Sequence, residues 1–115
     1  MMANVLFIVK ATISNREQET EWNDWYNEIH CREILRWPGA ISARRLRLIM
    51  GDDQFQYLTL YEFESEASFR GFWTSAHRNA ARRDYEQRFG AVSQLGQHGA
   101  YEELWRGFPG EGTTK

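Results

Sequence analysis

The pattern of hydrophobic and polar positions predicts a strand and then a long helix in the first third of the chain. Residues 4–11, NVLFIVKA, are apolar at both odd and even positions, which is typical of a strand covered on both faces. After a polar stretch, apolar residues recur at helical spacing and predict a helix over residues 21–36. The sequence WPG at 37–39 ends this helix, because a residue before proline avoids the helical conformation and glycine suits a turn.

The middle of the chain predicts a β-hairpin. Residues 40–50 and 55–64 have strand character, and the polar cluster GDDQ between them favours a turn. Aromatic side chains occupy one parity of the second of these strands and leucines the other, so we expect both of its faces to be covered in part.

A second helical region follows, and its pattern indicates a break. Ser65 is placed to cap its first turn. Beyond Ala76 the apolar face changes direction, so one straight helix cannot keep both parts on one core. We therefore predict a break near residues 74–77, with Ser75 capping a second helix. Residues 100–108 form the last predicted strand.

The predicted order β-α-β-β-α-β indicates an α+β, ferredoxin-like fold, with a four-stranded antiparallel sheet and helices on one face. We expect a single domain over residues 1–108 and a flexible tail over 109–115. Because the strands are apolar on both parities, one copy alone would expose a large apolar sheet face. A homodimer that packs sheet against sheet would cover that face.

Composition narrows the class of protein. The chain has 115 residues, enough for one domain, and its aromatic fraction of 15% predicts a folded chain. A net charge of −2 gives no general attraction to nucleic acid or to an anionic membrane. The first apolar run is too short for a signal peptide or a membrane helix, and there is one cysteine. We therefore predict a cytoplasmic protein.

Three motifs give the chain a family resemblance. The motifs are WNDWYNEIH (22–30), WPGAISARRLRL (37–48) and LTLYEFES (58–65) with FRGFW (69–73). Together with the element order, they resemble the dimeric α+β barrel superfamily, most closely its EthD-like branch, over residues 4 to about 108. This resemblance implies a dimer of packed sheets and a small-molecule cavity between sheet and helices. It also implies that His30 lines the cavity, while Cys31 and Arg32 depart from the family pattern and leave the reaction open.

His30 is the main candidate for chemistry. On a regular helix it lies about 40° from Tyr26 and about 60° from Glu33, so the three side chains would share one side. A histidine can donate or accept a proton near neutral pH, Glu33 could orient its ring, and Tyr26 could hydrogen-bond a substrate carbonyl. The alternative is a flank residue that hydrogen-bonds Glu33 or a backbone carbonyl.

Further candidates would bind substrate or assist His30. Trp25 and Trp73 are predicted to wall a pocket for a flat ligand, and Tyr57 on the aromatic strand is a third binding candidate. His77, at the predicted helix break, is either a second catalytic residue or a solvent-facing residue near a cap. Arg45 would bind a substrate carboxylate, or else pair with acids on neighbouring strands.

The remaining patterns favour chemistry without a metal or cofactor. The histidines at 30, 77 and 98 lack the local spacing of metal ligands, and we treat His98, in a glycine-rich loop, as exposed. Phosphate-binding glycine loops and serine elbows are missing from the sequence. We therefore predict a lyase or isomerase that moves a proton next to a carbonyl of a small cyclic, aromatic or polyketide-like substrate. The alternatives are a haem-binding or quinone-forming monooxygenase and a non-catalytic binding protein.

Overall fold

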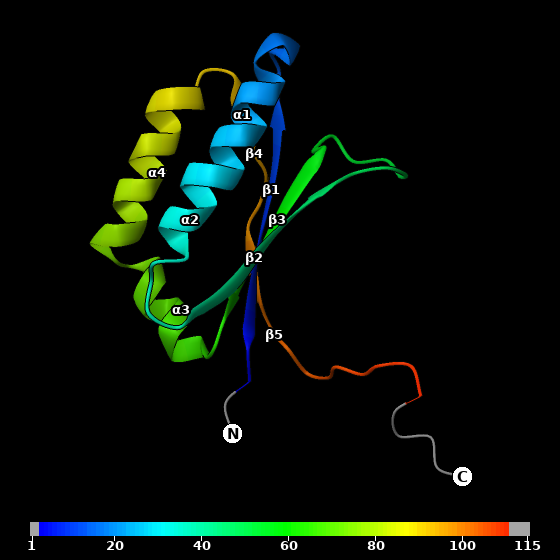
Figure 1. Cartoon of the computed structure of the whole chain (residues 1–115), viewed down its shortest axis with the longest axis vertical. Helices are drawn as coiled ribbons and strands as arrows, with labels where there is room; N and C mark the ends of the chain where they lie inside the picture. The colour runs from blue at the N-terminus through cyan, green and yellow to red at the C-terminus, as the bar shows by residue number, and fades with distance from the viewer. Residues whose placement is uncertain (1–2, 111–115) are drawn as a thin grey trace.

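The computed structural model describes residues 3–110, which form an antiparallel sheet with helices on one face (Figure 1). The strand order is β2-β3-β1-β4, and β5 also pairs with β1. The strands are β1 (Val5–Ile13), β2 (Ala40–Arg47), β3 (Tyr57–Phe63), β4 (Ser93–Leu95) and β5 (Gly99–Glu102). The predicted α+β, ferredoxin-like arrangement is confirmed.

The last strand differs from its prediction. Two short strands, β4 and β5, replace the expected strand over 100–108, and they lie end to end along β1. β4 pairs with Ala11–Ile13, whereas β5 pairs with Val5–Ile8. The polar sequence of β4 has no alternation that would mark it as a strand, and its pairing with the backbone of β1 defines it. Of the predicted flexible tail 109–115, residues 111–115 lie outside the described residues.

The first helical region is interrupted by a π turn that the sequence pattern did not reveal. Its elements are a 3-10 turn (Arg16–Gln18), α1 (Glu19–Trp25), the π turn (Tyr26–His30) and α2 (Cys31–Ile34). The Cys31 N–H donates to the Tyr26 carbonyl, five residues back, so the turn holds one more residue than an α-helical turn. The buried face therefore shifts by one position: Ile34 is buried, while Ile29 is 48% exposed.

The second helical region has the predicted break. Its helices are α3 (Glu66–Trp73) and α4 (Ala76–Phe89). Ser65 and Ser75 are the N-caps, and their hydroxyls accept hydrogen bonds from the backbone N–H groups of Ser68 (3.1 Å) and Arg78 (3.0 Å). In the part of the chain that the structure describes, no helix is both long and apolar enough to cross a membrane.

The two faces of the sheet differ in burial. Odd-numbered residues of β1 and β3 face the helices and are buried, and they form most of the core with Trp22, Trp25, Tyr26, Phe72 and Tyr85. Even-numbered residues of the same strands point to the other face, which none of the helices within residues 3–110 covers (Figure 1). Four of them are apolar and only half-buried: Leu6, Ile8, Leu58 and Leu60. This alternation shows which strand positions can reach a cavity beneath the helices.

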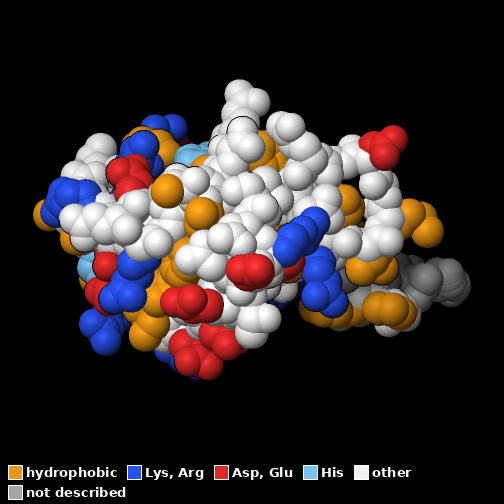
Figure 2. All heavy atoms as spheres, turned by 90° about the horizontal axis from the view of Figure 1, so that it is seen from above, with side chains coloured by type: hydrophobic (Ala, Val, Ile, Leu, Met, Phe, Trp, Pro, Cys, Tyr) orange, Lys and Arg blue, Asp and Glu red, His pale blue; other side chains and the backbone are white. Residues whose placement is uncertain are grey.

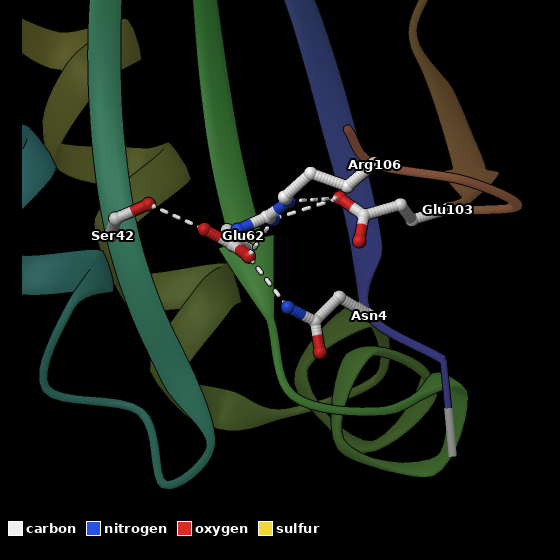
Figure 3. A network of polar contacts seen from close by, with 5 residues as sticks. All are labelled: Asn4, Ser42, Glu62, Glu103 and Arg106. Carbon is white, nitrogen blue, oxygen red and sulfur yellow. Dashed lines mark hydrogen bonds and ion pairs between the residues drawn. The ribbon is translucent and has the colours of Figure 1, made fainter. Parts of the chain in front are cut away.

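One acidic side chain on the uncovered face ties the C-terminal segment to the sheet (Figure 3). Glu62 accepts hydrogen bonds from Asn4 (2.6 Å), Ser42 (3.0 Å) and Arg106 (3.1 Å). Arg106 also donates to Glu103 at 2.8 Å. Burial raises the pKa of Glu62, but the hydrogen bonds outweigh this effect and the pKa is lowered overall. Glu62 therefore stays ionised and holds Arg106 against β3.

Two segments project away from the body of the molecule and expose apolar side chains. The molecule measures 55 × 36 × 23 Å, and the β2–β3 hairpin end and the C-terminal segment extend from the side opposite the helices (Figure 1). The most exposed apolar side chains on these segments are Ile49 (93%), Met50 (87%), Leu104 (88%) and Trp105 (84%). Figure 2 shows hydrophobic side chains gathered at this end of the molecule.

Candidate active site

His30 closes the π turn and lies among aromatic rings. Its ring stacks on Trp25, with centroids 5.2 Å apart and an interplanar angle of 22°. The centroid of the Tyr26 ring lies 5.1 Å from that of His30, with the two rings nearly perpendicular, and the centroid of Tyr85 of α4 lies 5.2 Å away. The extra residue of the π turn places His30 where a regular helix would have placed Ile29. The histidine consequently faces the space between the helices and the sheet.

A small cavity of about 70 Å³ adjoins His30. The sheet contributes Phe7 and Tyr61 to its wall, and α4 contributes Arg78, Arg82 and Tyr85. Most of the lining is aromatic or aliphatic, with a few polar groups, as in binding sites for small organic molecules. His30 is thus a polar group in an apolar enclosure.

A larger cavity of about 520 Å³ lies beside the first, between α3 and the strands β1 and β5. Phe69 and Trp73 of α3 form part of its wall. Phe7 and His98 line both cavities, and the two rings meet edge to face at 5.8 Å. A ligand that spans both cavities would therefore pass between Phe7 and His98.

The environment of His30 fixes its protonation state. Burial lowers its pKa, the Asp84 carboxylate opposes this effect and the Arg45 cation adds to it, and the net pKa is about 4. At neutral pH the imidazole is therefore uncharged and able to accept a proton, but it has none of the acidity of an imidazolium.

The tyrosines around His30 remain protonated. Burial raises the pKa values of Tyr26, Tyr61 and Tyr85. The Tyr85 hydroxyl accepts a hydrogen bond from Trp22 Nε1 at 3.1 Å and also hydrogen-bonds Ser93. These hydroxyls can therefore donate hydrogen bonds but cannot serve as bases near pH 7.

Four of the sequence candidates meet at or beside the cavities. Tyr26 and His30 line the small cavity, as predicted, and Trp25 lies behind the His30 ring. Trp73 lines the larger cavity and carries the Arg78 guanidinium on its ring at 3.7 Å. Cys31 is buried and its sulfur lies 3.6 Å from the Tyr61 hydroxyl, so it is directed at the sheet.

The structure removes Glu33 and His77 from this group. The Glu33 carboxylate pairs with Arg36 at 3.6 Å, and the π turn shifts the buried face by one residue, so Ile34 and not Glu33 faces the core. His77 Nε2 lies 2.6 Å from the Glu33 backbone carbonyl, and the imidazole joins α4 to α2. Neither side chain lines either cavity. The predicted catalytic role of His77 and the predicted binding role of Glu33 are therefore not supported.

Arg45 and Tyr57 also lie away from these cavities. The Arg45 guanidinium is 4.0 Å from the centroid of the Tyr26 ring and donates to Asn23 (2.8 Å) and Asn27 (3.0 Å). The Tyr57 hydroxyl donates to Glu19 and accepts from Asn23 at 3.2 Å. Both side chains are held by aromatic and amide partners between the first helix and the sheet. The substrate contacts predicted for them are therefore not supported.

Several residues at the cavities were missed by sequence reasoning. His98 is exposed, as predicted, but it also lines both cavities. Arg78 and Arg82 lie in the basic run HRNAARRDYEQR (77–88), whose interleaved acids are typical of a solvated helix face. They are four residues apart, and Tyr85 of the apolar face follows three residues later, so this spacing places all three side chains on one side of α4.

The strand order and the helices on one face of the sheet define an α+β, ferredoxin-like fold, as the order of elements in the sequence predicted. The chain belongs to the family described as "Domain of unknown function (DUF4286)", whose model matches residues 4–94. Among curated proteins, none matches the chain by sequence.

Solved structures share this fold at low sequence identity. An EthD family protein from Bacillus halodurans is 16% identical, with a TM-score of 0.63, covering 90% of this chain and 100% of its own. HapK from Hahella chejuensis is 12% identical, with a TM-score of 0.69, covering 90% and 96%. SnoaB from Streptomyces nogalater, a cofactor-independent oxygenase, is 19% identical, with a TM-score of 0.62, covering 95% and 99%. These likenesses establish the fold.

Proposed function

We propose that the chain is a cofactor-independent enzyme that moves a proton at a carbon next to a carbonyl of a small cyclic or aromatic molecule. The observation that carries this proposal is an uncharged, half-buried His30 facing an aromatic cavity. A neutral imidazole in such a place has the free electron pair that proton abstraction requires. Cyclisation, isomerisation, dehydration and decarboxylation through an enol all use such a step, so the enzyme would be a lyase or an isomerase.

In the proposed reaction, a ring nitrogen of His30 takes the proton from the substrate carbon. The electron pair of the broken C–H bond moves into the carbonyl and forms an enolate oxygen. In a cavity with a mostly apolar lining, the imidazolium and the enolate interact more strongly than they would in bulk water. The imidazolium then returns its proton to another substrate atom, which completes the transfer and restores neutral His30.

The aromatic lining supports a flat substrate. Tyr26, Phe7 and Tyr85 present ring edges and faces to the small cavity, and Phe69 and Trp73 do so in the larger one. Ring surfaces of this kind favour a planar apolar body over a flexible polar one.

The test is proton exchange at a probe ketone. 2-Tetralone, a bicyclic ketone, is incubated in D₂O and its α-hydrogen exchange is followed by NMR. We expect the protein to accelerate exchange, and His30→Ala to lower that acceleration by roughly 10²–10⁴-fold, the usual scale of an acid–base group. His77→Ala is the matched control and should leave the rate unchanged. A His30→Ala protein with the wild-type exchange rate would contradict the proposal, and ligand binding without any exchange would favour a binding protein.

Oxygenation is the second candidate function. The likeness to SnoaB, a cofactor-independent oxygenase, favours it, because removal of a substrate proton also precedes reaction of a carbanion with oxygen. Dissolved oxygen consumed in step with the substrate would identify this activity. A haem fits less well, since the cavity at His30 measures only about 70 Å³ and His77 Nε2 lies on a backbone carbonyl.

We also propose that the chain forms a homodimer through the uncovered sheet face. Half-buried leucines on that face, exposed Leu46 (48%) and Tyr101 (59%), and the apolar projecting segments support this. Analytical ultracentrifugation at micromolar concentration should show a dimer that Leu60→Asp dissociates. A wild-type monomer under these conditions would contradict the proposal.

A further inference from the structure

The charged groups around the small cavity are of one sign. Arg78 and Arg82 of α4 line it together with His98, and none of the described residues in its lining is acidic. Arg82 pairs with Glu86 at 2.9 Å and its side chain is 59% exposed. Within residues 3–110, Arg78 forms no ion pair; its guanidinium lies over the Trp73 ring at 3.7 Å and donates to the Trp73 carbonyl at 3.4 Å. Arg78 is thus held in place with its charge uncompensated.

The positive charges of these arginines lower the pKa values of ionisable groups near them. Burial lowers the pKa of Arg78, and the nearby Arg82 cation lowers it further. The pKa of His98 is also lowered, first by burial and then by Arg78 and Arg82. The two like charges beside the His98 imidazole form a region where an anion would relieve repulsion.

The acidic groups that line the larger cavity do not line the small one. Glu66 is paired with Arg70 at 2.6 Å on α3, and Glu102 is at the end of β5. The apolar part of that cavity, around Phe69 and Trp73, adjoins the arginines through the stacking of Arg78 on Trp73. A flat ring against Phe69 and Trp73 would therefore place a substituent close to Arg78 and His98.

We propose that Arg78, Arg82 and His98 form an anion subsite that takes the carboxylate of an aromatic or cyclic acid. The inference rests on the proposed function in that it assigns a substrate class to the same cavity. An arginine fork binds a carboxylate by paired hydrogen bonds, and the stacked position of Arg78 reduces the conformational entropy that binding would cost. The carboxylate would also bring a negative charge to the region of His30, which would make that ring a better base.

The test uses 2-naphthoate and its uncharged counterpart 2-naphthamide, with affinities measured by isothermal titration calorimetry. We expect naphthoate to bind at least about tenfold more tightly than naphthamide, by the strength of a charge-assisted pair. Arg78→Gln should remove this preference by weakening naphthoate alone, and Arg78→Lys should retain part of it. Arg83→Gln, an exposed arginine on the same helix outside the cavity lining, is the matched control and should change neither affinity.

Two results would overturn the subsite. One is equal affinity of the wild-type protein for the two probes, and the other is an unchanged preference in Arg78→Gln combined with Arg82→Gln. Thermal unfolding and circular dichroism show whether these variants fold. His30→Ala should keep the preference for naphthoate over naphthamide, so loss of proton exchange with a retained preference would separate a failure of the proposed reaction from a failure of the subsite.

Discussion

The two helical regions both contain an interruption, and each interruption has a histidine beside it. Between α3 and α4, Ser75 caps the new helix and His77 hydrogen-bonds the Glu33 carbonyl. In the first region the helix does not stop: a π turn inserts one residue, and His30 at its end faces a cavity. The break between α3 and α4 joins two helices through His77, whereas the π turn directs the His30 side chain towards a cavity.

This difference explains which histidine is suited to chemistry. His77 Nε2 is engaged by the backbone and lies outside both cavities. His30 contacts aromatic rings, so its nitrogens are available to a ligand from the cavity side. Single π turns often occur at functional sites, because the extra residue alters the direction of a side chain without ending the helix.

The largest expected effect tests the π turn through a pair of isoleucines. A regular helix would bury Ile29, but the π turn buries Ile34 and leaves Ile29 at 48% exposure. Ile34→Ala should lower the free energy of unfolding by about 2–5 kcal/mol, the usual cost of an emptied core position. Ile29→Ala should lower it by less than about 0.5 kcal/mol. Urea denaturation measures both, and a reversed order would mean that the first helix is regular.

The break at Ser75 could be predicted from the sequence, whereas the π turn could not. The fold followed from the order of strands and helices, and the break at Ser75 followed from a capping residue and a change of apolar face. The π turn has no such marker, because Tyr26–His30 consists of ordinary helical residues and only packing against the sheet selects the extra residue. Glu33 was misplaced for this reason, whereas His30 reached the cavity as the family resemblance implied.

Arg78, Arg82 and His98 show a second limit of the sequence. The sequence places the two arginines on one side of a helix, but the run around them contains acids and resembles a solvated face. His98 reaches the cavities only because β4 and β5 both pair with β1 and leave it at the gap between them. Such long-range pairing cannot be read from local periodicity.

The next effect is a loss of folding stability at acidic pH that depends on His30. Its pKa is about 4 in the folded chain and about 6.5 when unfolded, so the unfolded chain binds more protons between these values. Stability is therefore full above about pH 6.5 and is lost as the pH falls towards 4, by up to about 3 kcal/mol. His30→Phe should flatten this dependence in urea titrations at pH 4.5 and 7. An equal loss in the wild type and the variant would assign it to other groups.

A smaller effect is expected at the cap of α4. Ser75→Ala removes the acceptor for the Arg78 N–H and should cost about 1 kcal/mol of unfolding free energy. Because Arg78 belongs to the proposed anion subsite, fraying of this turn should also weaken naphthoate binding. Ser65→Ala, which uncaps α3, is the control: a similar loss of stability is expected, with the preference for naphthoate over naphthamide unchanged, because α3 contacts the ring and not the carboxylate.

The smallest effect concerns His77 and separates the two histidines most directly. His77→Ala removes the partner of the Glu33 carbonyl and should lower the free energy of unfolding by about 0.5–1.5 kcal/mol, the net value of one hydrogen bond. Its proton-exchange rate, measured where the variant is fully folded, should equal that of the wild type, because the ring does not line either cavity. His77→Gln, whose amide can still donate to the carbonyl, should recover part of the stability. A large loss of exchange in folded His77→Ala would instead place His77 in the reaction and would remove the contrast between the capped break and the π turn.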